Sequence, residues 1–126
     1  MRPIKIPMTL AIALTLTACA APTVSTDLGP MKYDASGTMP CSAGAPTYSG
    51  ACGWRVVRKA DGSAEIWISN IAVRDKPAYR VLDFSGGEFS TRDGAKLQVT
   101  KDGDTWSVSV PGREYYRFAD ALITGG

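Results

Sequence analysis

The sequence predicts an all-β domain, a small antiparallel meander of about seven short strands that forms a barrel or a two-layer sandwich. Segments of β-type residues alternate with turn dipeptides at spacings of roughly ten residues. Apolar and polar residues alternate within several segments, which is typical of a sheet with one buried face. No segment shows convincing helical periodicity over the length of a helix.

The clearest hairpin centres on Asp61-Gly62, a dipeptide typical of a two-residue turn. One β-type segment, 53–59, precedes it, and a second, 64–73, follows it. We expect Val57 in the core, together with Leu82 and the tryptophan and phenylalanine side chains.

Later segments follow the same plan of a β-type run and then a turn. Three of them are predicted: 78–84 before Gly86-Gly87, 95–101 before Asp102-Gly103, and 105–110 before Pro111-Gly112. In the third, Trp106, Val108 and Val110 alternate with serines, which gives one apolar face. Residues 118–122 fit either one helical turn or a last strand.

The N-terminus has the pattern of an exported lipoprotein. Arg2 and Lys5 precede an apolar run at 8–16, which is shorter than the about 20 residues that span a bilayer. The run ends in Leu-Thr-Ala-Cys, which resembles the lipobox of bacterial lipoproteins, so 1–18 are interpreted as the signal and Cys19 as the lipidated residue. The alternative is ordinary signal cleavage near this cysteine, without modification.

The segment after the signal indicates how the mature chain is attached to the membrane, and the charge balance limits its partners. Residues 19–31 are rich in Ala, Pro, Thr and Ser, and we interpret them as a lipidated N-terminus and flexible tether before a single domain at 32–126. Ala20 follows the cysteine, where inner-membrane lipoproteins commonly carry Asp, which favours the outer membrane. Loss of the two cationic signal residues leaves 12 basic against 12 acidic residues, so nucleic acid is excluded as a partner.

With Cys19 acylated, Cys41 and Cys52 are the only remaining pair, and an oxidising envelope compartment favours a structural disulfide between them. The loop between them is rich in Gly, Ala, Ser and Pro, and closing a loop of this size stabilises a small domain by roughly 2.5 to 3 kcal/mol. The spacing does not match a redox C-x-x-C motif, and without histidine a zinc site lacks ligands.

The chain has no histidine, which excludes Ser-His-Asp and Cys-His catalysis. Asp102 with Asp104, or Asp93 with Glu88, are candidate acid–base pairs by proximity in sequence. Asp93 and Asp102 each precede a glycine, however, and turn chemistry explains both better. We therefore expect no catalytic residue, no cofactor and no metal, and hence no enzymatic activity.

A candidate binding surface rests on aromatic residues that exceed what so small a core needs. They are Trp67, Tyr79, Tyr115 and Tyr116. Surplus aromatics on a sheet face form flat platforms for glycans or protein partners. The simpler alternative, which is favoured, places the tryptophans in the core or in cross-strand pairs.

Three stretches resemble a group of small secreted bacterial proteins of unknown function. They are SGTMPC at 36–41, CGWRVVR at 52–58 and GREYYRFADALITGG at 112–126. The group shares a G-x-x-P-C start, a second cysteine before an aromatic-x-V-x-R strand, and an ending like Y-x-I-x-D-A-x-I-x-G-G, in which Phe118 here replaces Ile. The resemblance implies the paired cysteines and a shared β fold, and it implies no activity.

These observations predict an envelope lipoprotein with a binding or structural role, whose partners are the membrane, through the lipid, and an envelope protein or glycan. The alternative is a proteinaceous inhibitor of an envelope hydrolase such as lysozyme, because several such inhibitors are compact β lipoproteins with a disulfide.

The lipidation hypothesis predicts the mass and the location of the mature protein. Its intact mass should correspond to a chain that begins at Cys19 and carries acyl groups, and Cys19→Ser should release the protein from the membrane fraction because the anchor is lost. An unmodified N-terminus in the mass spectrum would refute the hypothesis.

Overall fold

The computed structural model describes residues 32–73 and 79–126. The predicted signal and tether, residues 1–31, lie outside the described residues. One compact unit spans Lys32–Gly126. Within the described ranges, no helix is long and apolar enough to cross a membrane.

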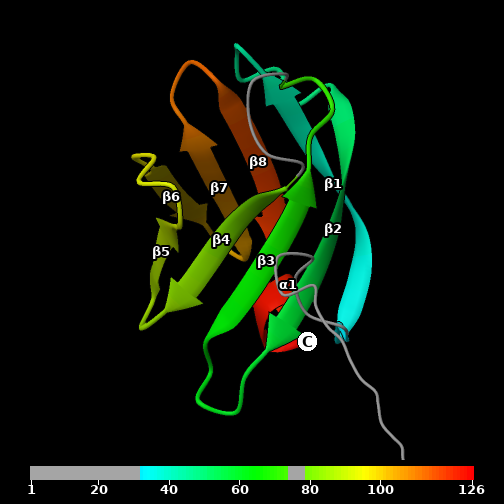
Figure 1. Cartoon of the computed structure of the whole chain (residues 1–126), viewed down its shortest axis with the longest axis vertical. Coiled ribbons are helices and arrows are strands. Elements are labelled where there is room, and N and C mark those ends of the chain that lie inside the picture. The colour runs from blue at the N-terminus through cyan, green and yellow to red at the C-terminus, as the bar shows by residue number, and fades with distance from the viewer. Residues whose placement is uncertain (1–31, 74–78) are drawn as a thin grey trace, which may run out of the picture. The chain divides into compact units, whose positions relative to one another are not determined.

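Eight antiparallel strands form one sheet, which confirms the all-β prediction with one strand more than expected. The elements are β1 (Ala35–Ala43), β2 (Gly50–Arg58), β3 (Ala64–Ser69), β4 (Arg80–Ser85), β5 (Glu88–Thr91), β6 (Gln98–Asp102), β7 (Thr105–Val110), β8 (Glu114–Ala119) and the helix α1 (Ala121–Thr124). Their order in the sheet is β5-β4-β3-β2-β1-β8-β7-β6. Figure 1 shows the sheet curling until β5 and β6 approach each other, so the fold is a nearly closed barrel.

All four predicted turn dipeptides connect consecutive strands. They are Asp61-Gly62 between β2 and β3, Gly86-Gly87 between β4 and β5, Asp102-Gly103 between β6 and β7, and Pro111-Gly112 between β7 and β8. The first turn is further fixed by Asp61, whose Oδ1 accepts hydrogen bonds from the Ser63 N–H at 2.9 Å and the Ser63 hydroxyl at 2.6 Å. The sequence therefore encodes its hairpins locally.

The core lies inside the barrel and takes alternate side chains of strands such as β3 and β8, whereas β6 is exposed along its whole length. Leu82, Val108 and Val110 are buried as predicted. Val57 is only partly buried, and its neighbour Val56 is fully buried instead, because Val56 pairs with Ile66 on the inner face. A shift of one residue along a strand exchanges its two faces, which explains this error.

The two ends of the sheet meet through aromatic rings rather than through a hydrogen-bonded ladder. Phe89 of β5 lies 4.9 Å from Trp106 of β7 and 5.9 Å from Phe118 of β8, between ring centroids. Phe84 of β4 lies 4.9 Å from Phe89. Among the described strands, β5 and β6 do not pair, so this cluster closes the barrel by packing.

The C-terminal segment combines the two structures that were predicted as alternatives. Phe118 belongs to β8, whereas Leu122 belongs to the single helical turn of α1. Leu122 and Ile123 are buried, and α1 packs against β2 and β8. The helix thus covers one end of the core (Figure 1).

Cys41 and Cys52 form the disulfide, which joins β1 to β2 and lies in the core. Replacing both cysteines by serine should lower the free energy of unfolding by about 2.5 to 3 kcal/mol, because the unfolded chain regains the entropy of the open loop. Urea denaturation with and without reductant measures this loss. The reductant should affect only the wild type, and equal midpoints for wild type and variant would contradict the prediction.

Candidate functional site

Among the described residues, the two buried charged side chains form an ion pair inside the barrel. Glu114, at the start of β8, is 0% exposed, and Arg80, at the start of β4, is 5% exposed. Arg80 Nε donates to Glu114 Oε1 at 2.8 Å, and Arg80 Nη2 donates to Glu114 Oε2 at 2.5 Å. This bidentate geometry compensates both groups for the loss of water.

Tyr116 belongs to the same buried network. Its hydroxyl donates to Glu114 Oε1 at 2.7 Å and accepts a long hydrogen bond of 3.5 Å from Asn70 Nδ2, which also donates to Ser42 O at 3.3 Å. Burial, and then the neighbouring Glu114 carboxylate, raise the pKa of Tyr116 above its ordinary value. Tyr116 therefore does not contribute to the predicted binding surface: the residue is 1% exposed and lies in the core, on the inner face of β8.

Asp93 completes the network from the connection between β5 and β6. Arg80 Nη1 donates to both Asp93 carboxylate oxygens, at 2.9 and 2.8 Å, and the Ala95 N–H donates to Oδ1 at 3.1 Å. The Ala95 N–H, and to a lesser extent Arg80, lower the pKa of Asp93 below its ordinary value, against an opposing effect of burial. The native carboxylate therefore contributes stability above its unfolded-state pKa, and this contribution is lost as the pH falls through the lower folded-state pKa.

The network links two carboxylates through one guanidinium. Arg80 holds both carboxylates, and Tyr116 donates to one of them. Asp102 and Asp104, the other candidate acid–base pair, are exposed at the β6–β7 turn. Among the described residues, no group of three or more Asp, Glu or Cys side chains is placed to hold a metal ion.

Two of the predicted surface aromatics do come together, on the outer face of the barrel. Trp67 of β3 and Tyr79, just before β4, meet edge to face with ring centroids 5.9 Å apart. They form one wall of a trough of about 360 Å³ that crosses β1, β2 and β3. We call this hollow the outer trough; its other lining residues are Ser36, Gly37, Thr38, Gly53, Trp54, Arg55 and Ser69.

The floor of the outer trough is open because its residues are small. Gly53 lies at the centre of β2, and a Cβ added there would have no heavy atom within 4 Å beyond its neighbours. Ser69 pairs with Gly53 across the strands, and Thr38 pairs with it on the other side. The trough is therefore a flat strip with hydroxyl groups beside an aromatic wall.

Charged neighbours hold Trp67 in position. Its indole N–H donates to Glu65 Oε1 at 3.2 Å, and the Arg92 guanidinium lies 5.4 Å from the ring centroid. Arg92 is itself held by Asp83 in two hydrogen bonds of 2.9 Å. A cation above the ring and an acceptor at its edge fix the rotamer, so the wall is preorganised.

Tyr115 lies elsewhere, on the outer face of β8. Its ring meets that of Tyr48 at 6.3 Å, and its hydroxyl accepts the Gly112 N–H at 2.7 Å. The four predicted aromatics thus occupy three separate places. Sequence reasoning missed the small residues of the trough, whose signal, a glycine and hydroxyl residues at alternate positions of neighbouring strands, is visible only once the strand register is known.

The ion pair predicts a large effect of one substitution and a small effect of another. Glu114→Ala should lower the free energy of unfolding by about 3 to 5 kcal/mol, because the Arg80 charge stays buried after its carboxylate partner is removed. Asp93→Ala should cost about 1 kcal/mol or less, because its side chain is 47% exposed.

Urea denaturation of both variants tests this order. The double variant Arg80→Leu, Glu114→Leu should lose less stability than Glu114→Ala, since no charge stays unpaired at that position. A Glu114→Ala variant as stable as the Asp93→Ala variant would contradict the interpretation.

Comparison with known proteins identifies no relative of this chain. No protein-family model, no curated protein and no solved structure matches it. The resemblance to small secreted bacterial proteins therefore stays a prediction.

Proposed function

We propose that this protein is a lipid-anchored binding module of the bacterial envelope, and that it holds a glycan in the outer trough. The observation that carries the proposal is the preorganised aromatic wall of Trp67 and Tyr79 beside an open floor. A sugar ring presents an apolar C–H face and a rim of hydroxyl groups, and both have counterparts here.

The chemistry of the lining supports a glycan rather than an apolar ligand. Ser36, Thr38 and Ser69 offer hydroxyl donors and acceptors along the floor, and Arg55 is the single charged residue of the lining. The aromatic wall supplies the apolar contact while the rest of the site stays polar, a combination that suits a solvent-exposed polymer.

The proposed location agrees with this ligand class. An acyl anchor at Cys19 and a tether at 19–31 would hold the domain beside the polysaccharides of the envelope. The mature chain carries no formal net charge, so recognition would rest on the site itself rather than on a general electrostatic attraction. A module of this kind acts by binding and not by catalysis.

Trp67→Ala should weaken binding of soluble cell-wall oligosaccharides at least about tenfold, because it removes the stacking wall. Isothermal titration calorimetry of the oligosaccharide into the purified protein measures the change in affinity. Tyr115→Ala is the matched control: it removes an aromatic ring from the outer face of β8 and should leave the affinity unchanged.

Two outcomes would reject the proposal. One is the failure of the wild type to bind any cell-wall oligosaccharide at millimolar concentration. The other is a slowing of lysozyme on intact cell walls by the protein that Trp67→Ala does not alter. The second result would favour the hydrolase inhibitor over a glycan-binding module.

A further inference from the structure

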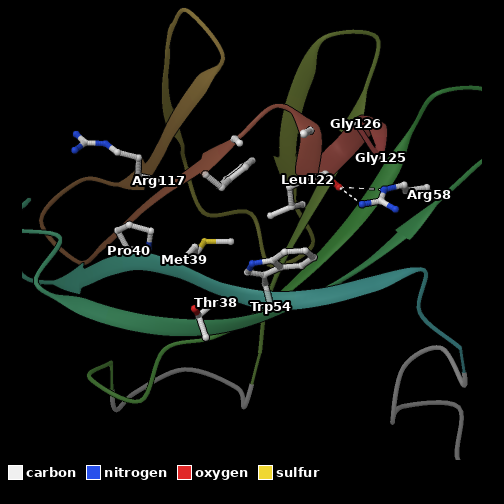
Figure 2. Close-up of a pocket in the computed structure, with 12 residues that line it drawn as sticks. Thr38, Met39, Pro40, Trp54, Arg58, Arg117, Leu122, Gly125 and Gly126 are labelled. Atoms are coloured by element: carbon white, nitrogen blue, oxygen red, sulfur yellow. Dashed lines mark hydrogen bonds between the residues drawn. The ribbon is translucent and has the colours of Figure 1, made fainter.

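A second hollow lies where β1 and β8 stop pairing. Their ladder contains only three residue pairs, and the next pair in the register would join Pro40 to Arg117. The Gly44 N–H donates to Arg113 O at 3.1 Å, and hydrogen-bonded pairs recur at every second residue, so Pro40 occupies a hydrogen-bonded position. Proline has no N–H, and the ladder ends there. Figure 2 shows the two strands diverging beyond this point, with Trp54 in the gap between them.

The gap is a groove of about 400 Å³, within the size range of small-molecule sites. We call it the β1–β8 groove. Its apolar lining comes from four elements: Met39 of β1, Trp54 of β2, Phe118 of β8 and Leu122 of α1. In Figure 2 the Trp54 ring lies across the groove, with Leu122 above it.

Gly37 leaves room for the Trp54 ring, and the indole N–H of Trp54 has no acceptor among the described residues. It pairs with Gly37 across the strands, and a Cβ on Gly37 would come within 3.0 Å of the indole ring. The other two tryptophans donate their indole N–H to carboxylates. In the part of the chain that the structure describes, the Trp54 N–H has no acceptor.

The charged side chains of the groove have one sign. Two arginines line it and no Asp or Glu does; Gly126, which also lines it, carries a main-chain carboxylate. Arg58 donates from Nε and Nη2 to Leu122 O, at 3.1 and 3.0 Å, which leaves Nη1 without a hydrogen bond to any described residue. Arg117 points away from Trp54 in Figure 2, and its guanidinium lies 3.8 Å from the Tyr48 ring centroid. Arg58 is therefore the cation available to a ligand.

We propose that the β1–β8 groove binds a monomeric amphipathic carboxylate, with its apolar chain across Trp54 and its carboxylate on Arg58. The Arg58 guanidinium, which has no ion-pair partner among the described residues, selects an anion, and the apolar walls select a hydrocarbon body. A single available cation and a groove of this size fit one acyl chain with one head group, rather than a membrane lipid with two chains. The groove shares Thr38 and Trp54 with the lining of the outer trough, but the carboxylate contact rests on Arg58, which lines the groove alone, and does not depend on the proposed glycan function.

Titration with dodecanoate below its micelle concentration tests the proposal. The full chain carries Cys19→Ser, so that no covalently attached acyl chain competes. Two-dimensional ¹⁵N NMR should show a saturable shift of the Trp54 indole N–H signal and of the Arg58 Nε–H signal. Trp54→Phe identifies the indole signal, because it removes one of three.

Three variants separate the roles of charge and packing. Arg58→Gln should weaken dodecanoate binding about tenfold or more, because it removes the charged partner of the carboxylate. Arg58→Lys should retain most of the affinity, since it keeps the charge. Trp67→Ala, the outer-trough variant, should bind dodecanoate like the wild type. The same spectra report whether each variant is folded.

Three results would overturn the proposal. Equal shifts with dodecyltrimethylammonium would mean adsorption of any surfactant. Binding to anionic lipid vesicles without binding of monomeric dodecanoate would assign the surface to a membrane. Shifts that leave the Arg58 Nε–H signal unchanged, or no shift at all, would leave the groove without a ligand. None of these results bears on glycan binding, which the Trp67 variant tests separately.

Discussion

Arg80 and Glu114 connect two halves of the barrel that, in the described sheet, share a single hydrogen-bonded ladder. Strands β1 to β5 form one meander and β6 to β8 a second, and the three-pair ladder between β1 and β8 is the hydrogen-bonded link between them. The ion pair bridges β4 and β8 through the interior, and Asp93 extends it to the connection between the meanders. Such a pair adds little net stability over an apolar pair, but any register that separates its charges is strongly disfavoured.

The hairpins and the alternating strands were predictable because their signals are local. A turn dipeptide such as Asp61-Gly62 and an alternation such as that of β7 each lie within a few residues of sequence. The inner face of β2 was not predictable in the same way. Val56 and Val57 are adjacent and chemically identical, and only pairing with β3 decides which one is buried. The short strand β5 was hard to recognise because four residues carry almost no periodicity.

The candidate sites depended still more on long-range structure. Trp67 and Tyr79 were recognised as surplus aromatics, but the hydroxyl and glycine residues beside them come from three strands. Tyr116 was indistinguishable in sequence from Tyr115, and the inner face of β8 alone assigns it to the core. Buried Arg and Glu are rare without a partner. The sequence around Arg80 gives no sign that its partner, Glu114, lies 34 residues further along the chain.

Pro40 has a consequence for the dynamics of the barrel. The strands that it keeps apart come from residues about 75 positions distant in the chain, so closing the loop between them is costly in conformational entropy. Among the ladders of the described sheet this one is the shortest, and regions with few main-chain hydrogen bonds are those in which local opening costs least. We therefore expect local opening between β1 and β8, beside the Trp54 ring, whereas the disulfide covalently links β1 to β2 on its other side.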